Sequence, residues 1–186
     1  ADESQFYPAN QLHNQLTRQL LRVLFYGQFI PLHGIEFIVR AAKILEKDNV
    51  EFTIIGNGQE YKKIRDIADE MDVCNINWID WVEYYRLVNY IKEADIVLGI
   101  FGDSDKAKRV IPNKAFQAIA CKKPLITGDS PAARELFLDG ENALLCQTSD
   151  PRAIAESIRL LRDNENLRIK IGVNGYNTYL SQCNIE

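Results

Sequence analysis

The 186-residue sequence contains no apolar run near the ~20 residues that a helix needs to cross a lipid bilayer, and no signal-peptide pattern at its start. It also has no strong charge of one sign, because its formal net charge is -4 and its acidic and basic residues are well mixed. This balance favours neither nucleic acid nor an anionic membrane surface as a partner. The length fits one ordinary globular domain.

Cysteine is scarce, and its spacing is not that of a metal site. Cys74, Cys121, Cys146 and Cys183 form no Cys-x-x-Cys pair, and neither histidine lies near them in the sequence. The sequence therefore predicts no zinc site. Scattered thiols in a chain of this size are typical of a reduced, cytoplasmic protein, and we expect that location.

Three common nucleotide-binding or signalling motifs are missing as well. No Gly-x-x-x-x-Gly-Lys-Ser/Thr sequence occurs, which excludes a P-loop. The loop at residues 27–34 lacks the Gly-x-Gly-x-x-Gly of a nicotinamide-binding or flavin-binding domain, and the second expected strand ends in Gly56-Asn57-Gly58 rather than in an acid. The first strand also lacks the acidic cluster of a response-regulator receiver.

What the sequence does contain, from residue 22 onward, is a regular alternation of short apolar runs and stretches with helical periodicity. The expected strands are residues 22–27, 52–55, 76–79, 96–100, 124–127 and 143–146. The expected helices are residues 35–45, 61–71, 84–94, 114–120 and 132–138, with two more between 151 and 180. We predict an α/β fold: a Rossmann-like, doubly wound parallel sheet of about six strands with helices on both faces. A ligand would bind at the carboxyl ends of its strands.

The first residues do not follow this alternation. Residues 1–20 are rich in Gln and Asn, contain Pro8, and have the composition of a connector. We therefore predict an interdomain linker at residues 1–20 and a Rossmann-like domain at residues 21–186, with a further domain before the linker that this chain lacks. Within the domain, Asp150 and Pro151 predict the start of a helix.

One predicted helix N-terminus is surrounded by basic residues that could bind an anion. Lys106, Lys108, Arg109 and Lys114 surround the N-terminus of the helix expected to begin at Lys114, in a protein that is acidic overall. We expect Asn113 to cap this helix and leave free N–H groups, and such an end suits a phosphate. A solvated, flexible basic loop is the alternative interpretation.

The loop after the first strand supplies a second set of candidates. His33 could donate a hydrogen bond to a phosphate oxygen, or it could bond only to the backbone at the turn into the next helix. Gln28 and Gly27 lie close by in the sequence, and glycine lets a ligand approach the backbone closely.

The order of these motifs resembles the C-terminal domain of retaining, GT-B-fold glycosyltransferases of the large family 4 (group 1). The resemblance covers nearly the whole chain, and it implies that residues 21–186 form a nucleotide-sugar-binding domain. Its segments are residues 1–8, similar to an interdomain crossing; 23–34, similar to a first strand and phosphate loop; 110–126, similar to a nucleotide-binding signature; and 134–136, 139–145 and 150–151.

The resemblance implies a role for each loop and leaves the catalytic residues unassigned. The implied diphosphate-binding residues are Gly27, Gln28, His33, Pro112, Asn113 and Lys114. The implied nucleoside-binding residues are Asp80, Trp81, Val82 and Gln117, and the implied sugar contacts are Asp103, Asp105 and Arg109. The chain departs from the family where Arg109 and Gln117 replace two signature glutamates and where His33 replaces a lysine.

The resemblance also implies an activity for the full-length protein. That activity is transfer of a hexose-type sugar from a nucleoside-diphosphate sugar to an acceptor hydroxyl with retention, as in polysaccharide biosynthesis, with no cofactor and no metal. The expected partners are the donor, the chain's own N-terminal acceptor domain, and a glycan or lipid-linked acceptor. The full-length protein would be cytoplasmic and peripheral to the membrane, and the isolated domain inactive. The alternatives are a GT-B-like nucleotide-sugar epimerase and a non-catalytic nucleotide-sugar-binding module.

Overall fold

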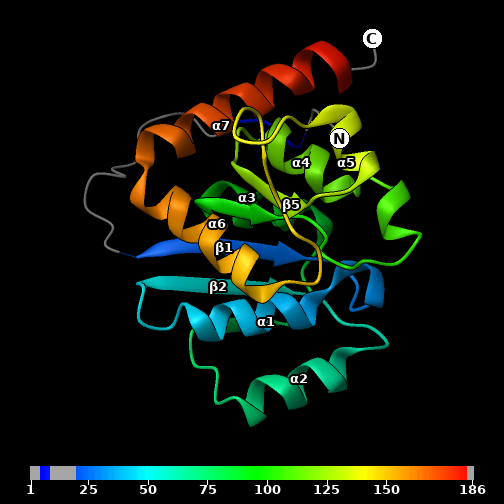
Figure 1. The fold of residues 1–186 in the computed structure, drawn as a ribbon, viewed down its shortest axis with the longest axis vertical. Coiled ribbons are helices and arrows are strands. Elements are labelled where there is room, and N and C mark those ends of the chain that lie inside the picture. The colour runs from blue at the N-terminus through cyan, green and yellow to red at the C-terminus, as the bar shows by residue number, and fades with distance from the viewer. Residues whose placement is uncertain (1–4, 9–19, 184–186) are drawn as a thin grey trace.

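The computed structural model describes residues 5–8 and 20–183, which contain one six-stranded parallel sheet (Figure 1). The strands are β1 (Leu21–Tyr26), β2 (Val50–Ile55), β3 (Ile76–Ile79), β4 (Ile96–Leu98), β5 (Leu125–Gly128) and β6 (Leu144–Cys146). Their order is β3-β2-β1-β4-β5-β6, and every neighbouring pair is parallel. This is the doubly wound Rossmann order, so the predicted fold class is confirmed.

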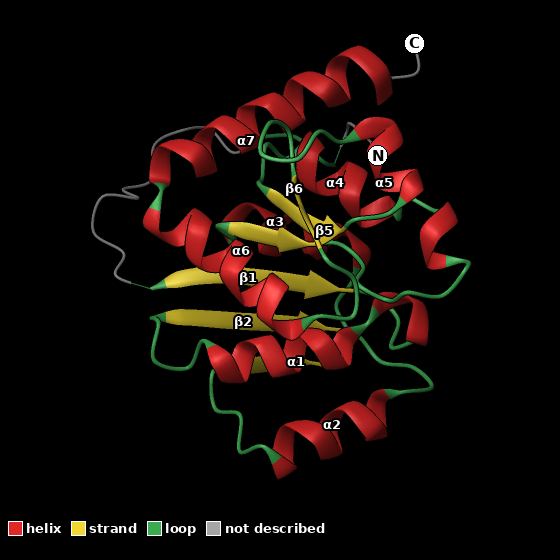
Figure 2. Ribbon diagram, viewed as in Figure 1, coloured by secondary structure: helices red, strands yellow, loops and turns green. Residues whose placement is uncertain are grey.

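Helices cover both faces of the sheet (Figure 2). They are α1 (Ile35–Ile44), α2 (Tyr61–Glu70), α3 (Tyr84–Glu93), α4 (Asn113–Ala120), α5 (Pro131–Leu136), α6 (Pro151–Asp163) and α7 (Glu165–Thr178). Short 3-10 turns span Pro31–His33 and Ala107–Arg109, and a π-helical turn spans Tyr179–Cys183. Helices α1, α2 and α6 pack on one face, whereas α3 and α4 pack on the other.

The central strand shows why the apolar runs in the sequence are continuous. Val23 and Phe25 of β1 belong to the core on the α1 side, and Leu24 and Tyr26 belong to the core on the α3 side. Successive side chains of a strand point to opposite faces, so a strand covered on both faces buries all of them.

Two helix boundaries test the capping arguments with different outcomes. Helix α6 begins at Pro151 as predicted, and the Asp150 carboxylate accepts hydrogen bonds from the backbone N–H groups of Arg152, at 2.8 Å, and Ala153, at 3.3 Å. The predicted cap at Asn113 is wrong, because Asn113 is already the first residue of α4. Pro112 precedes it with extended backbone angles, and no side chain caps the helix.

The predicted linker lies largely outside the described residues, since only residues 5–8 and 20 of it are described. Phe6 is 2% exposed and packs in the same core as α3 and α4. Of the other boundaries, β4 ends at Leu98, two residues earlier than predicted. None of the helices within the described ranges is long and apolar enough to cross a membrane.

Candidate functional site

The strand order reverses between β1 and β4. Strand β1 pairs with β2 on one side and with β4 on the other, so the chain leaves these neighbouring strands in opposite directions. Their following loops are joined, because the N–H of Phe101 donates to the carbonyl of His33 at 3.1 Å and that of Gly102 donates to Leu32 at 3.3 Å. This is the switch point at which doubly wound sheets bind ligands.

Lys114 brings a buried cation to this switch point from the first turn of α4. Its side chain is 5% exposed, and its ammonium nitrogen Nζ has no hydrogen-bond partner among the described residues. Nζ lies 3.9 Å from the centroid of the Phe25 ring, a cation–π distance. Burial lowers the pKa of Lys114 well below its usual value of 10.5. A buried and unpaired ammonium is unfavourable unless an anion supplies the missing partner.

Gly27 and His33 lie beside this ammonium. A Cβ placed on Gly27 would stand 2.8 Å from Lys114 Nζ and 3.1 Å from His33 Cε1, so three of the six predicted diphosphate residues meet at one point. The structure also shows the backbone bond expected as one alternative for His33, since its Nδ1 donates to the carbonyl of Gln28 at 2.5 Å. The side chain of Gln28 itself is exposed.

The environment of His33 keeps its ring neutral. Burial, together with the Lys114 charge, lowers the pKa of His33 from 6.5 to about 4, although the bond to Gln28 opposes both effects. A neutral ring that donates through Nδ1 leaves Nε2 as an acceptor. His33 can therefore donate to a phosphate only after it gains a proton.

Gln117 lies one helical turn after Lys114, and its buried amide is held at both ends. Its Oε1 accepts a hydrogen bond from the hydroxyl of Tyr26 at 2.9 Å, and its Nε2 donates to the hydroxyl of Tyr84 at 3.2 Å. The sequence interpretation missed both tyrosines. Tyr26 ends the first strand and Tyr84 begins α3, and both positions are at the carboxyl edge of the sheet.

The other predicted nucleoside residues follow β3 on the same edge. The Asp80 carboxylate accepts a hydrogen bond from the hydroxyl of Tyr61 at 2.6 Å, and Val82 is partly buried. Trp81 is 74% exposed, which leaves its ring face open for stacking. Within the described part of the chain, neither Asp80 nor Trp81 forms a hydrogen bond with Gln117.

Burial separates the four cations that the sequence grouped together. Lys106, Lys108 and Arg109 are exposed, in contrast to Lys114. The guanidinium of Arg109 donates through Nε to the carbonyl of Asp105 at 2.9 Å, which holds it along its own loop. Its loop also carries the exposed carboxylates of Asp103 and Asp105.

The described carboxylates form no metal cluster. Within residues 5–8 and 20–183, no three His, Cys, Asp or Glu side chains gather closely enough to hold a metal ion. Asp103 and Asp105 are nevertheless spaced as Asp-x-Asp, a pattern that the sequence interpretation overlooked.

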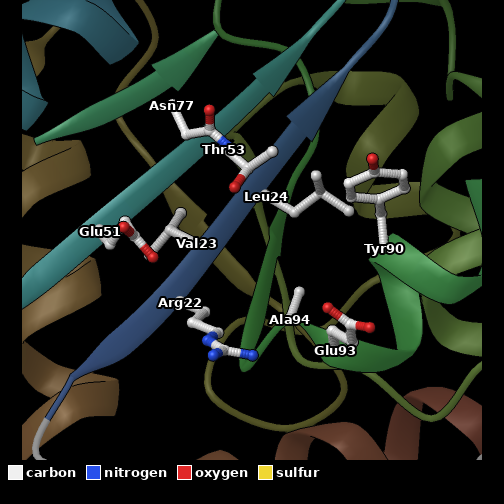
Figure 3. Close-up of a pocket in the computed structure, with 9 residues that line it drawn as sticks. All are labelled: Arg22, Val23, Leu24, Glu51, Thr53, Asn77, Tyr90, Glu93 and Ala94. Carbon is white, nitrogen blue, oxygen red and sulfur yellow. The ribbon is translucent and has the colours of Figure 1, made fainter. Parts of the chain in front are cut away.

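A separate hollow of about 220 Å³ lies on the α3 side of the sheet (Figure 3). Arg22, Glu51, Thr53, Asn77 and Glu93 are among the residues that line it. Arg22 and Glu51 stand at the second positions of β1 and β2, so this hollow extends toward the amino ends of the strands. None of the predicted site residues lines it.

A doubly wound parallel sheet whose strand order reverses between β1 and β4 defines the Rossmann-like class of domains. Comparison with known families then identifies the family. The family model for glycosyl transferases group 1 matches residues 12–178. The chain therefore belongs to the glycosyl transferases group 1 family.

Individual relatives agree with this assignment. The chain is 26% identical over 159 residues to an uncharacterized glycosyltransferase, MJ1178 of Methanocaldococcus jannaschii, covering 82% of this chain and 41% of that protein. The chain thus spans about two fifths of the length of the curated relatives it matches.

Solved structures show the same fold. The C-terminal domain of the group 1 glycosyl transferase LpcC from Francisella tularensis superposes with a TM-score of 0.82 at 21% identity, covering 100% of both chains. Anabaena HepE, solved in complex with UDP-glucose, superposes with a TM-score of 0.77 at 15% identity, covering 87% of this chain and 44% of HepE.

Proposed function

We propose that this chain is the donor-binding domain of a glycosyltransferase that uses a nucleoside-diphosphate sugar. The observation that carries the proposal is the buried ammonium of Lys114 at the switch point, which has no hydrogen-bond partner within the described ranges. A diphosphate placed there supplies the counter-charge that the protein does not provide. The complex of HepE with UDP-glucose supports this class of donor, because HepE shares the fold.

The diphosphate would contact Gly27, Lys114 and the uncapped first turn of α4. The N–H groups and the dipole of that turn attract negative charge, and Gly27 allows a phosphate to approach the backbone. Gln28, His33, Pro112 and Asn113 complete the proposed diphosphate site. The nucleoside would extend toward Gln117 and Trp81, with Asp80 and Val82 beside it, and the sugar toward Asp103, Asp105 and Arg109.

The proposed chemistry is electrostatic. As the bond between the anomeric carbon and the diphosphate breaks, negative charge develops on the leaving phosphate, and fixed donors stabilise it. The sugar passes to an acceptor hydroxyl with retention of configuration. We place the acceptor, a glycan or lipid-linked sugar, on a separate domain, so the isolated chain would bind the donor but transfer nothing.

We propose that donor binding needs no metal ion. Lys114 and the first turn of α4 can neutralise a diphosphate without one. Titrating UDP, GDP and ADP with MgCl2 and with EDTA tests this, and the two dissociation constants should agree. Substantially tighter binding with magnesium, lost in Asp103→Asn or Asp105→Asn, would contradict it.

Calorimetry on the chain tests the donor site itself. We expect one of UDP, GDP and ADP to bind, and Lys114→Ala to weaken that binding by about 10- to 100-fold, as expected for a charge-assisted hydrogen bond. Binding of the corresponding nucleoside should change little. Lys106→Ala, an exposed neighbour, is the matched control.

Two results would reject the proposal. One is the absence of binding for all three nucleoside diphosphates at millimolar concentration. The other is an equal loss of nucleoside and nucleoside-diphosphate binding in Lys114→Ala, because that result would remove the phosphate assignment.

A further inference from the structure

The side chain of Gln117 is connected through two contacts to a residue that is far from it in the sequence. The hydroxyl of Tyr84 accepts the hydrogen bond from Gln117 Nε2 at 3.2 Å. The Tyr84 ring in turn meets Phe6 edge to face, with centroids 5.6 Å apart and planes at 68°. Phe6 therefore contacts the residue that holds Gln117 without being part of the site.

Phe6 is much more deeply buried than Tyr84. It is 2% exposed and belongs to the same buried cluster as Leu87 and Val88 of α3, whereas Tyr84 is 54% exposed. An exposed tyrosine at the first position of a helix has several accessible rotamers, and an aromatic partner on one side restricts them. Packing against Phe6 thus limits where the Tyr84 hydroxyl can lie.

The oxygen of the Gln117 amide accepts a hydrogen bond from a residue of the sheet. The Tyr26 hydroxyl is buried at the end of β1 and lies 2.9 Å from Gln117 Oε1 and 3.4 Å from the carbonyl of Lys114. A phenol carries one proton, and its shorter contact is with Gln117. With both ends engaged, the amide keeps one N–H and one oxygen lone pair for a ligand, both in fixed directions.

We propose that Phe6 and Tyr84 are positioning residues for the donor site: they fix the orientation of the Gln117 amide, one turn along α4 from Lys114. This inference rests on the proposed function, which places the nucleoside beside Gln117. It also gives the segment before the domain a part in donor recognition, because Phe6 belongs to that segment. Because the amide is already ordered before the ligand binds, binding carries a smaller cost in side-chain entropy.

The inference separates the two parts of the ligand. Pyrophosphate can use Lys114 and the first turn of α4 without touching Gln117, whereas a nucleoside diphosphate uses all three. Loss of the Phe6 or Tyr84 contact should therefore weaken binding of the nucleoside diphosphate and leave binding of pyrophosphate unchanged. A general loss of structure would weaken both.

The test measures dissociation constants by calorimetry for the nucleoside diphosphate that the unsubstituted chain binds among UDP, GDP and ADP, and for pyrophosphate. We expect Tyr84→Phe, which removes only the hydroxyl, and Phe6→Ala each to weaken nucleoside-diphosphate binding by about three- to tenfold, the effect of one hydrogen bond. Binding of pyrophosphate should stay the same. Tyr7→Ala is the matched control, since the Tyr7 ring is 52% exposed and its close contact is with the Lys92 ammonium.

A double-mutant cycle shows whether Phe6 acts through Gln117. In the Gln117→Ala background, Phe6→Ala should have no further effect on nucleoside-diphosphate binding. Thermal unfolding checks that each variant is folded, and if Phe6→Ala unfolds the chain, Tyr84→Phe decides alone.

Three outcomes would overturn the inference while leaving the donor site intact. They are unchanged nucleoside-diphosphate binding in Tyr84→Phe, an equal loss of pyrophosphate binding, and an equal loss in Tyr7→Ala. If the unsubstituted chain binds none of the three diphosphates, the proposed function fails and this inference fails with it.

Discussion

The ammonium of Lys114 lies 3.9 Å from the centre of the Phe25 ring and has no hydrogen-bond partner among the described residues. An aromatic face stabilises a cation by about 0.5–2 kcal/mol, which is less than the cost of removing an ammonium from water without a counter-ion. The free protein therefore holds Lys114 at a cost in stability. Such a cost is expected where a side chain serves binding rather than folding.

Replacing Lys114 with methionine should thus stabilise the free chain while removing diphosphate binding. We expect the free energy of unfolding at pH 7 to rise by about 1–3 kcal/mol, the cost of a buried unsatisfied polar group. Chemical denaturation measures this change, with Lys106→Met as the control that should have little effect. Because folding lowers the pKa of Lys114, the unfolded chain binds more protons than the folded chain at pH values between the lowered pKa and 10.5. The advantage of the methionine variant should therefore shrink as the pH rises toward 10.5, and a constant or growing advantage would contradict this account.

His33 makes the stability of the chain depend on pH in a defined window. Its folded pKa is about 4 and its ordinary value is 6.5, so between these values the unfolded state binds more protons. The contribution of His33 to the free energy of unfolding is therefore complete above pH 6.5 and is lost as the pH falls toward 4. Between pH 7 and pH 4.5, we expect the free energy of unfolding of the unsubstituted chain to fall by about 2 kcal/mol more than that of the His33→Asn variant. Denaturant titrations at both pH values measure the difference, and parallel pH profiles for the two proteins would rule it out.

Asp48 joins the loop between α1 and β2 to helix α6. Its carboxylate accepts hydrogen bonds from Arg159, at 2.8 Å, and from Arg162, at 2.7 Å, and these two bonds lower its pKa below 3.8. Asp48→Asn should lower the free energy of unfolding by about 1 kcal/mol, a value kept small because the arginines are partly exposed.

Asp66→Asn is the control for this effect. In the described part of the chain, the ion pair of Asp66 is with the exposed Lys62. This substitution should leave the unfolding midpoint unchanged. The effect of Asp48→Asn should also vanish as the pH falls well below 3.8, because the native carboxylate then becomes protonated as well. An Asp48→Asn effect that is independent of pH would show that its charge is not responsible.

The sheet could be predicted from the sequence because its signal is local. Strands covered on both faces leave unbroken apolar runs, and the helices between them leave a helical period, so all six strands were expected close to where they lie. The start of α6 was predictable for the same reason, since Asp150 and Pro151 act within one turn.

The site could be predicted only in part. Gly27, His33 and Lys114 were named as candidates, but the burial of Lys114 depends on the Phe25 ring, which is distant in sequence. The bonds that hold Gln117 span 91 and 33 residues, and no short motif encodes them. The predicted cap at Asn113 was wrong because the extended backbone stops at Pro112, so the helix begins one residue earlier than expected and includes Asn113. The N-cap preference of asparagine does not reveal this boundary.

The loop that carries Gly27 depends on a second glycine in the neighbouring loop. Gly56 follows β2 with φ of +141°, and a Cβ placed on it would lie 1.9 Å from the carbonyl oxygen of Gly27. Gly56→Ala therefore has to displace Gly27 as well as adopt a backbone conformation that L-residues avoid.

We expect Gly56→Ala to lower the free energy of unfolding by about 3 kcal/mol or more, combining backbone strain with a steric clash. Gly140→Ala separates the two causes, since Gly140 has φ of +72° with nothing within 4 Å of an added Cβ. That control should lose only about 1 kcal/mol, the cost of the left-handed conformation alone. Denaturant titration of both variants measures the difference. Equal losses would mean that the contact between the two loops contributes nothing, whereas a larger loss in Gly56→Ala, together with weakened pyrophosphate binding, would tie the position of Gly27 to the anion site.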